Sequence, residues 1–463
     1  MPDAAQVPDD VMAVIRGLKN AGKQAWLAGG AVRDLLSGKG AQDFDVATDA
    51  MPEQVLRLFP KTVPTGIQHG TITVVTPAHH VEVTTFRGEG PYLDGRRPSS
   101  VTFLGDIDGD LARRDFTVNA MAWDPVSGEL RDPFGGQRDL QRRRLRAVGD
   151  ALARFREDGL RPLRAVRFAC TLRLAIEPAT RRAISETLDV FDKVARERVR
   201  DELMKLLVRG APPSRGMRLL QRTGLLAHIW PELLESVRFP QNRYHRWDVW
   251  RHTLRCLDAS QADPIVRLAA LLHDVAKPRC AAPKEGAPGE NTFYNHEKVG
   301  AALAAEMMQR LKFANRDTER VALLVAEHNW YYLPEWNDAT VRRTLQRIGI
   351  DALPQLWALR RADLAARGNL VAEGLENQAQ AEERFAAEIA RASALKITDL
   401  AIGGDDVMRE LGLPPGPRVG EILTALLDRV IDDPDLNTRE QLLRLLPEML
   451  QDLSTNNSQR RRG

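Results

Sequence analysis

The sequence predicts an α+β protein, with a mixed sheet and helices over about the first 150 residues and helices alone after them. Short β-like runs, separated by glycine and proline, lie between Gln24 and Gly149. They are Thr71–Val75, Val81–Phe86 and Val101–Phe103. Beyond Asp150, apolar residues recur at three- and four-residue spacing, which is typical of helices. The clearest examples are Leu163–Leu172, Arg198–Leu207, Ile265–Val275 and Ala301–Leu311.

The composition is that of an ordinary globular protein with several domains. Hydrophobic residues make up 43% and charged residues 28% of 463 positions, which excludes a disordered or membrane class, and the length favours roughly two to four domains. No apolar run reaches the ~20 residues of a membrane helix, and Met1–Asp10 lacks the features of a signal peptide. Three cysteines without metal-site spacing fit a reducing compartment. We therefore expect a cytoplasmic protein without a membrane partner.

Interruptions of the helical sequence pattern divide the chain further. Glycine and two prolines interrupt Arg209–Ser214, and Ala281–Glu290 reads as a loop rich in Gly, Pro and Ala. We expect a head over 1–150, a helical neck over 151–215, a helical domain over 216–370, a C-terminal helical body over 371–453 and a disordered basic tail over 454–463.

The first candidate site is the run Asp43-Phe44-Asp45-Val46-Ala47, which alternates polar and apolar residues. In a strand, both carboxylates would project to one face while Phe44 and Val46 face the core. Two adjacent carboxylates repel each other unless a cation neutralises them, and Mg²⁺ is the hard cation that prefers such ligands. The pair alone is also compatible with an ordinary solvent-facing strand.

A glycine-rich turn precedes this pair and strengthens the prediction. Ala25–Ala28 is apolar, and Gly29-Gly30 follows it directly, ahead of a segment with helical spacing. Glycines permit close backbone approach, and a helix start with Arg33 one turn in would favour a triphosphate.

A third acid, Glu82, lies in the alternating run Val81–Arg87. It would lie beside Asp43 and Asp45 if the strands are neighbours, or it would simply face solvent. Both interpretations stay open from the sequence.

Six motifs follow in the order seen in class II CCA-adding enzymes and bacterial poly(A) polymerases, and the chain resembles that family over roughly residues 24 to 210. The motifs are Gly29–Leu36, Asp43–Thr48, Tyr92–Pro98, Arg113–Ala122, Asp132–Gly136 and Glu157–Arg161. The resemblance implies that residues 1–150 form a nucleotidyltransferase head similar to that of DNA polymerase β.

The resemblance also implies chemistry, in which two metal ions assist transfer of a nucleotide to an RNA 3′ end. Asp43 and Asp45 would hold Mg²⁺, with Glu82 as an additional candidate. Gly30 and Arg33 match family positions that contact the nucleotide. Arg114 matches a position that contacts its phosphate or sugar, and we expect the neighbouring Asp115 to orient Arg114.

In this family, the positions of Asp158 and Arg161 act as an amino-acid template for the incoming base. A carboxylate accepts a hydrogen bond and a guanidinium donates one, which complements the edges of cytosine and adenine. Uracil and guanine offer the reverse pattern, which leaves buried groups unpaired at roughly 1–3 kcal/mol each. The pair would therefore admit CTP and ATP and reject UTP and GTP.

Asp158, Arg161, Arg164 and Arg167 have three-residue spacing, which predicts one helical face. That face would line a nucleotide cleft or, alternatively, form a solvated surface of ion pairs. Pro162 replaces the aliphatic residue usual in the family and Gly159 replaces a proline. We expect a proline inside a helical turn to shift Arg161 and alter base selection.

A second constellation resembles the HD superfamily of metal-dependent phosphohydrolases and implies an HD-type domain over 216–370. First-choice ligands are His252, His273, Asp274 and Asp363, and His296 and His328 would hold a second metal. The resemblance implies a transition metal such as Ni²⁺, Co²⁺ or Mn²⁺ and hydrolysis of phosphomonoesters or cyclic phosphates by a metal-activated water, with Lys277 near the phosphate. The alternative is a remnant in a structural domain that holds tRNA.

The function that the resemblance implies is CCA addition to tRNA, with CTP, ATP and tRNA as partners and no obligate protein partner. One alternative is a poly(A) polymerase, or an enzyme that adds only CC or only A, because the head motifs of these enzymes overlap. A second is an HD phosphohydrolase whose head merely binds nucleotide. A non-catalytic RNA-binding protein would lack one of the carboxylates at Asp43 and Asp45, and both are present.

Overall fold

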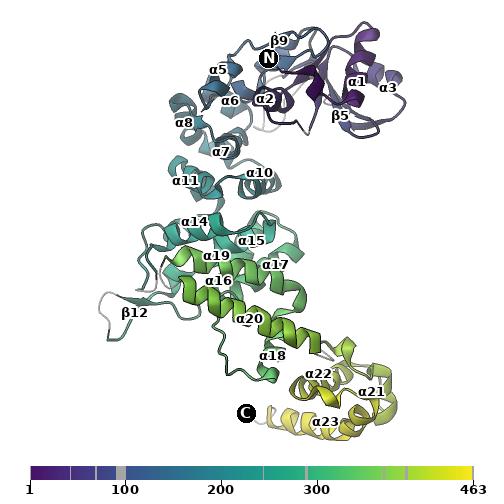
Figure 1. Cartoon of the computed structure of the whole chain (residues 1–463), viewed down its shortest axis with the longest axis vertical. Coiled ribbons are helices and arrows are strands. Elements are labelled where there is room, and N and C mark those ends of the chain that lie inside the picture. The colour runs from purple at the N-terminus through teal and green to yellow at the C-terminus, as the bar shows by residue number, and fades with distance from the viewer. Residues whose placement is uncertain are drawn as a thin grey trace. The chain divides into compact units, whose positions relative to one another are not determined.

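We describe a computed structural model of the chain (Figure 1). The described residues are 2–41, 43–67, 70–89, 101–242, 245–286, 290–368, 371–391 and 395–460. The motif Tyr92–Pro98 falls outside them. The chain divides into two compact units. Unit 1 is Met1–Glu235 with Met307–Ala314, and unit 2 is Ser236–Glu306 with Asn315–Gly463.

A mixed sheet organises the start of unit 1. Among the described residues it has seven strands, in the spatial order β3-β4-β5-β2-β1-β8-β9. Their bounds are β1 Ala25–Ala28, β2 Asp45–Thr48, β3 Thr62–Gly66, β4 Thr71–Val75, β5 His80–Thr85, β8 Ala122–Trp123 and β9 Leu130–Arg131. β2 runs parallel to β5 and antiparallel to β1. The expected strands are confirmed, although Val101–Phe103 forms β7 and pairs only with β6 (Arg87–Glu89).

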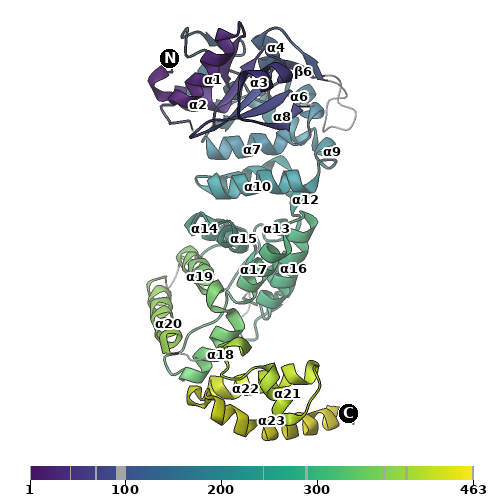
Figure 2. The ribbon, with the colours of Figure 1, turned by 90° about the vertical axis from the view of Figure 1, so that its right-hand side faces the viewer.

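The core of the head lies between this sheet and helices α1 (Asp9–Asn20) and α3 (Pro52–Leu58), which Figure 2 shows beside the strands. Ile15 and Leu18 of α1 are fully buried, as are Val81 and Val83 of β5. Alternation along β5 is the period-2 pattern of a strand with one buried face. Glu82, which lies between Val81 and Val83, therefore projects from the opposite face of the sheet.

Helices follow the sheet in unit 1, as apolar spacing predicts. α6 (Ala151–Glu157), α7 (Arg161–Thr171), α10 (Arg196–Arg209) and α11 (Pro213–Thr223) come in order, and α7 and α10 lie side by side in both ribbon views. The expected break is confirmed, because α10 ends at Arg209 and α11 begins at Pro213. Proline is tolerated in the first turn of a helix, where its missing N–H has no intrahelical partner.

Unit 2 is built mainly from helices. α14 (Val249–Ala259), α15 (Pro264–Leu272), α17 (Asn315–Ala326) and α19 (Leu353–Arg367) pack together. A separate apolar core joins α21 (Gly404–Leu411), α22 (Pro417–Asp432) and α23 (Arg439–Arg460). In the part of the chain that the structure describes, no helix is long and apolar enough to cross a membrane.

Three expectations for the helical part need correction. β11 (Ala175–Ile176) pairs in parallel with β10 (Arg144–Leu145), where backbone N–H groups of Ala175 and Glu177 donate to the carbonyls of Arg143 and Leu145 at 2.8 and 2.9 Å. The expected loop Ala281–Glu290 contains β12 (Ala282–Pro283), which pairs with β13 (Asn291–Thr292). The expected disordered tail is helical from Ser454 to Arg460, within α23. No glycine or proline interrupts those residues.

Candidate active site

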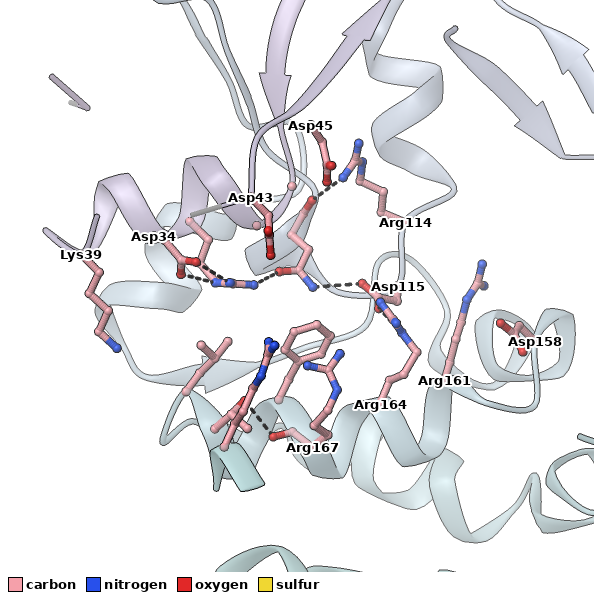
Figure 3. A pocket seen from close by; sticks show the side chains of 18 of the residues that line it. Asp34, Lys39, Asp43, Asp45, Arg114, Asp115, Asp158, Arg161, Arg164 and Arg167 are labelled. Atoms are coloured by element: carbon pink, nitrogen blue, oxygen red, sulfur yellow. Dashed lines mark hydrogen bonds and ion pairs between the residues drawn. The ribbon is translucent and has the colours of Figure 1, made fainter. Parts of the chain in front are cut away.

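Two aspartates mark one end of a cavity of about 700 Å³ in unit 1. Asp43 directly precedes β2, and Asp45 is the first residue of that strand. Phe44 and Val46 are buried on the opposite side, as the alternating pattern predicts. Figure 3 shows the carboxylates of Asp43 and Asp45 both extending into the cavity.

Glu82 lies opposite Asp45 on the neighbouring parallel strand β5. Burial raises the pKa of Asp45 to about 6, and the nearby carboxylates of Glu82 and Asp43 add to that rise although Arg114 opposes it. Clustered carboxylates that resist ionisation are a donor set that suits a divalent cation. The position of Glu82 thus favours the interpretation as a third acid, although its side chain is exposed.

The glycine turn after β1 brings the backbone close to Arg114. Gly29 has a φ of 73°, and a Cβ there would come within 2.5 Å of a terminal nitrogen of Arg114. A side chain at this position would therefore displace that guanidinium as well as strain the backbone. Gly30 begins α2 (Gly30–Leu36), and both glycines line the cavity.

Arg33 of α2 begins a chain of hydrogen bonds across the floor of the cavity (Figure 3). Its Nη1 donates to Oδ1 of Asn119 at 2.6 Å, and Nδ2 of Asn119 donates to Oδ1 of Asp115 at 3.2 Å. Nε of Arg164 donates to Oδ2 of the same aspartate at 2.9 Å. Asn119 therefore connects the glycine turn to α7.

Asp115 does not orient Arg114, contrary to our expectation. Burial alone would raise the pKa of Asp115, but Arg164 holds that pKa below its usual range. Arg114 instead has an ion pair with Asp110 at 3.3 Å and donates to the carbonyl of Asn119 at 3.3 Å. Arg114 and Asp115 lie in a bend of the chain, and although they are adjacent they contact different partners.

The expected helical face is also partly wrong, because α7 begins only at Arg161. Asp158 follows the last residue of α6 and has extended backbone, with φ −135° and ψ 109°. Its Oδ2 accepts from Nη2 of Arg198 at 2.8 Å, and its Oδ1 accepts from the backbone N–H of Leu160 at 3.0 Å. Asp158 and Arg161 nevertheless line the same cavity.

The guanidinium of Arg161 is held in place by several acceptors. It pairs with Glu157 and donates to the carbonyls of Arg154 at 2.8 Å and Arg113 at 3.2 Å. Pro162 occupies the first turn of α7, where it breaks no helical hydrogen bond. The expectation that Pro162 shifts Arg161 is therefore wrong, because this proline lies in the first turn of the helix and not in its interior.

Arg164 and Arg167 complete the basic wall of the cavity. Arg167 pairs with Glu202 of α10, which is only 3% exposed, and its guanidinium carbon lies 3.8 Å from the ring centre of Phe168. Arg164 stays ion-paired with Asp115 at 2.7 Å. These contacts fix the long side chains before any ligand arrives, which lowers the entropic cost of binding an anion.

Unit 2 gathers all six residues of the second constellation into one buried cluster. We call it the HD cluster; it contains His252, His273, Asp274, His296, His328 and Asp363. Nε2 of His252 lies 2.9 Å from Oδ1 of Asp363, and Nε2 of His273 lies 3.1 Å from Oδ2 of Asp274. Oδ1 of Asp274 is buried and has no hydrogen-bond partner within 3.5 Å among the described residues; it lies 3.6 Å from His296 and 3.7 Å from His328.

Backbone carbonyls set the tautomers in this cluster. Nδ1 of His273 contacts the Ala270 carbonyl at 2.9 Å, and Nδ1 of His328 contacts that of Val325 at 2.7 Å. A carbonyl only accepts, so each Nδ1 donates to it, and Nε2 is the ring nitrogen that faces the carboxylates of the cluster. An Nε2 oriented in this way is the atom that would ligate a transition metal.

Comparison with known proteins covers nearly the whole chain. Family models match residues 25–146 (Poly A polymerase head domain), 173–236 (Probable RNA and SrmB- binding site of polymerase A) and 296–446 (tRNA nucleotidyltransferase domain 2 putative). The CCA-adding enzyme of Geobacillus kaustophilus (strain HTA426) is 35% identical over 448 residues, which cover 95% of this chain and 96% of that relative. The chain belongs to the CCA-adding enzyme family. It is therefore a nucleotidyltransferase.

Further relatives of the chain are also CCA-adding enzymes. The CCA-adding enzyme of Lactococcus lactis subsp. lactis (strain IL1403) is 32% identical and covers 93% of this chain and 94% of its own length. The crystal structure of the Bacillus stearothermophilus CCA-adding enzyme in complex with CTP superposes with a TM-score of 0.69 at 30% identity, covering 97% of this chain and 98% of that one. Enzymes of the family use a divalent metal, typically Mg²⁺.

Sequence reasoning missed several long-range contacts of the predicted site residues. Glu202 pairs with Arg167 from 35 positions away and Arg198 with Asp158 from 40, and Asn119, although it lies in the motif Arg113–Ala122, accepts from Arg33 at a distance of 86 positions. In unit 2, the ring of His245 lies 4.9 Å from that of His252. The HD-type domain itself stays a prediction, because the matching family model over 296–446 describes a nucleotidyltransferase domain.

Proposed function

We propose that the chain adds CMP and AMP from CTP and ATP to the 3′ end of tRNA and releases pyrophosphate. The observation that supports this most is one cavity with paired carboxylates at one end and the Asp158–Arg161 pair at another. In this proposal the carboxylates hold the metal ions that activate the reacting groups, and the Asp158–Arg161 pair reads the base. A cytoplasmic protein without an obligate protein partner fits this activity.

Asp43 and Asp45 would hold Mg²⁺, with Glu82 as an additional candidate. When bound, the ions would lower the pKa of the attacking 3′-hydroxyl and neutralise charge on the triphosphate. The raised pKa of Asp45 supports this assignment, because a cation would relieve the repulsion that burial and the neighbouring acids create.

Four arginines in the cavity are suited to the triphosphate. Arg33 and Arg114 lie next to the glycine turn at Gly30, and Arg164 and Arg167 extend from α7. Each already contacts a carboxylate or carbonyl that fixes its direction. Guanidinium groups bind phosphate oxygens in a planar, directional way, so these four side chains would hold the leaving pyrophosphate in line for transfer.

Asp158 and Arg161 would select the base. Each carboxylate oxygen of Asp158 accepts one hydrogen bond already and has a second lone pair for a base amino group. Arg161 donates to the neighbouring ring nitrogen in this scheme. Because both groups are anchored by other residues, they can impose one pattern on the base instead of adapting to it.

The test incubates tRNA that lacks its CCA end with CTP, with ATP or with both, and sequences the products. We expect CC from CTP alone and CCA from the mixture. Long A tails would indicate a poly(A) polymerase, and addition of only CC or only A from the mixture would indicate a partial enzyme. No extension with either nucleotide would exclude the class and favour an HD phosphohydrolase with a nucleotide-binding head.

The HD cluster supports a second activity, hydrolysis of phosphomonoesters or cyclic phosphates. The supporting observation is Oδ1 of Asp274, buried without a hydrogen bond among imidazole nitrogens. His252, His273, Asp274 and Asp363 would hold a metal such as Ni²⁺, Co²⁺ or Mn²⁺, and His296 and His328 would complete a second site. Lys277, which lies 2.7 Å from Asp274, is placed to pair with a phosphate.

Separate variants test this second activity. Phosphatase activity with added Ni²⁺, Co²⁺ or Mn²⁺ should survive Asp45→Ala and vanish with His273→Ala or Asp274→Ala. Absence of activity with all three metals would favour the structural remnant.

A further inference from the structure

A buried arginine links two segments of unit 2 that carry residues of the HD cluster. Arg360 lies on α19, three residues before Asp363 and therefore close to the same face of that helix. Nη1 of Arg360 donates to the backbone carbonyl of His328 at 2.7 Å. One side chain thus connects α19, which carries Asp363, to the turn after α17, which carries His328.

Trp330 gives the same turn a second contact with Arg360. The guanidinium carbon of Arg360 lies 4.4 Å from the centre of the Trp330 ring, a distance at which a cation is attracted to the face of an aromatic ring. The Trp330 ring also stacks on the rings of Trp336 and Phe385, with centroids 5.7 Å apart in each pair. Arg360 therefore holds the short segment from His328 to Trp330 at both of its ends.

The third partner of Arg360 is an amide on α20 (Val371–Arg391). Nε of Arg360 donates to Oε1 of Gln378 at 2.8 Å, and Nε2 of Gln378 donates to Oε1 of Glu382 at 3.0 Å. A planar guanidinium can donate in two directions and lie over an aromatic ring at the same time, which the ammonium group of lysine cannot do. Arginine is therefore the side chain that suits this combination of partners.

The charge of Arg360 is buried among neutral groups. The residue is 7% exposed, and no carboxylate in the described part of the chain forms an ion pair with it. Three other buried arginines each have such a partner: Arg33 pairs with Asp34, Arg161 with Glu157 and Arg342 with Glu388. A buried cation without an opposite charge costs stability. Its place between two segments of the HD cluster points to a use for Arg360 other than stability.

We propose that Arg360 is a positioning residue of the metal site in the HD cluster. This inference rests on the second activity proposed above, because that activity needs the metal. Nδ1 of His328 donates to the Val325 carbonyl, which orients the imidazole ring. Arg360 holds the backbone of His328, so that this ring and the carboxylate of Asp363 keep their places around a bound transition metal. Replacing a residue that orients a metal ligand typically changes metal affinity roughly 10- to 100-fold.

The first test measures Ni²⁺ affinity by calorimetry, because Ni²⁺ suits imidazole ligands. The reference is the full chain with Asp45→Asn, a change that reduces competition for the ion from the head, and every variant carries it. Arg360→Met should weaken Ni²⁺ binding roughly 10- to 100-fold. Arg360→Lys keeps a charge and a donor for the His328 carbonyl but loses the planar contacts, so we expect a loss of about three- to tenfold. Thermal unfolding without metal establishes that each variant is folded.

The matched control is Arg342→Lys, which makes the same change at another buried arginine of unit 2. Arg342 lies on α18 (Asp338–Ile348), pairs with Glu388 and donates to the Ile431 carbonyl at 2.6 Å, and none of these residues belongs to the HD cluster. This variant should lower the unfolding temperature, because the geometry of a buried ion pair is disturbed. Its Ni²⁺ affinity should stay within about twofold of the reference, since independent sites do not influence each other.

A double variant tests the route through His328. In a His328→Ala background, Arg360→Met should weaken Ni²⁺ binding by less than about a further twofold, because the ligand that Arg360 positions is already gone. Full additivity of the two losses would overturn the inference.

Unchanged Ni²⁺ affinity in both folded Arg360 variants would also overturn it, and Arg360 would then be a residue of the core alone. Absence of Ni²⁺ binding by the reference protein would contradict the proposed metal site itself, and this inference would fall with it. The two failures are distinguishable, because the second is seen before any change at Arg360.

Discussion

At the scale of single residues, Asp45 carries an energetic cost that a cation would remove. Its pKa rises from 3.8 to about 6 because the carboxylate is mostly buried near other acids. Between pH 4 and 6 the folded protein therefore binds more protons than the unfolded chain, and the metal-free fold loses stability as pH rises through that window.

Asp45→Asn should consequently stabilise the metal-free protein near pH 7, by up to about 3 kcal/mol, while reducing nucleotide addition on the order of 10³-fold. Thermal unfolding without divalent ions, from pH 4 to 7, measures the first effect. Added Mg²⁺ should stabilise the wild type but not Asp45→Asn. The control Asp108→Asn, at an exposed position of the head, should match the wild type in stability, Mg²⁺ response and activity. Equal stabilisation of the wild type and Asp45→Asn by Mg²⁺ would contradict the assignment.

Asp158→Asn should relax base selection. The amide can donate to the oxygen of uracil, which a carboxylate cannot. We expect the preference for CTP over UTP to fall roughly 10- to 100-fold, from the 1–3 kcal/mol cost of unpaired buried groups. Competition between the two nucleotides measures this ratio. The control is Asp189→Asn, at an exposed position of α9 (Leu188–Phe191), which should keep the wild-type preference. An unchanged CTP-to-UTP preference in Asp158→Asn would show that Asp158 does not read the base.

At the scale of elements, the turn between α6 and α7 is shaped by α9. A Cβ on Gly159 would lie 2.5 Å from the carbonyl oxygen of Val190, closer than packed atoms approach. A backbone oxygen cannot move aside as a flexible side chain does. This chain therefore requires glycine where its family usually has proline.

Gly159→Ala should cost about 1–3 kcal/mol and lower CTP addition, because the turn carries Asp158 and leads into Arg161. Thermal unfolding and extension assays measure the two effects. Gly105→Ala has no atom within 4 Å of the added carbon and should be nearly neutral. If Gly159→Ala matches that control, the close contact does not constrain the turn.

Elements were more predictable from sequence than the contacts between them. Alternation fixes strand faces near Asp45, and apolar spacing locates α7 and α10, because these signals are local. Asp115 pairs with Arg164, which lies 49 residues further along the chain. Arg167 pairs with Glu202, which lies 35 residues beyond it. Such pairs depend on how helices pack, which no local pattern specifies. The start of α7 was misjudged because three-residue spacing continued through Asp158, outside the helix.

At the scale of the whole molecule, each unit contains its own candidate metal site. His273→Ala should abolish stabilisation by Mn²⁺ or Ni²⁺, since a ligand of a buried site is lost, but should leave CCA addition within about twofold. Calorimetry with and without metal, alongside an extension assay, measures both. Asp45→Asn serves as the reciprocal control. Loss of CCA addition in folded His273→Ala would show that the units depend on each other.

The buried imidazole of His296 has a consequence for proton balance. Burial lowers its pKa to about 4, so at neutral pH the ring is already neutral. A metal ion that arrives there displaces no proton from this ring. At Asp45 the pKa is about 6, so protons compete with Mg²⁺ as soon as the medium becomes mildly acidic. Acidification would then empty the head of its ion while His296 remained ready to bind.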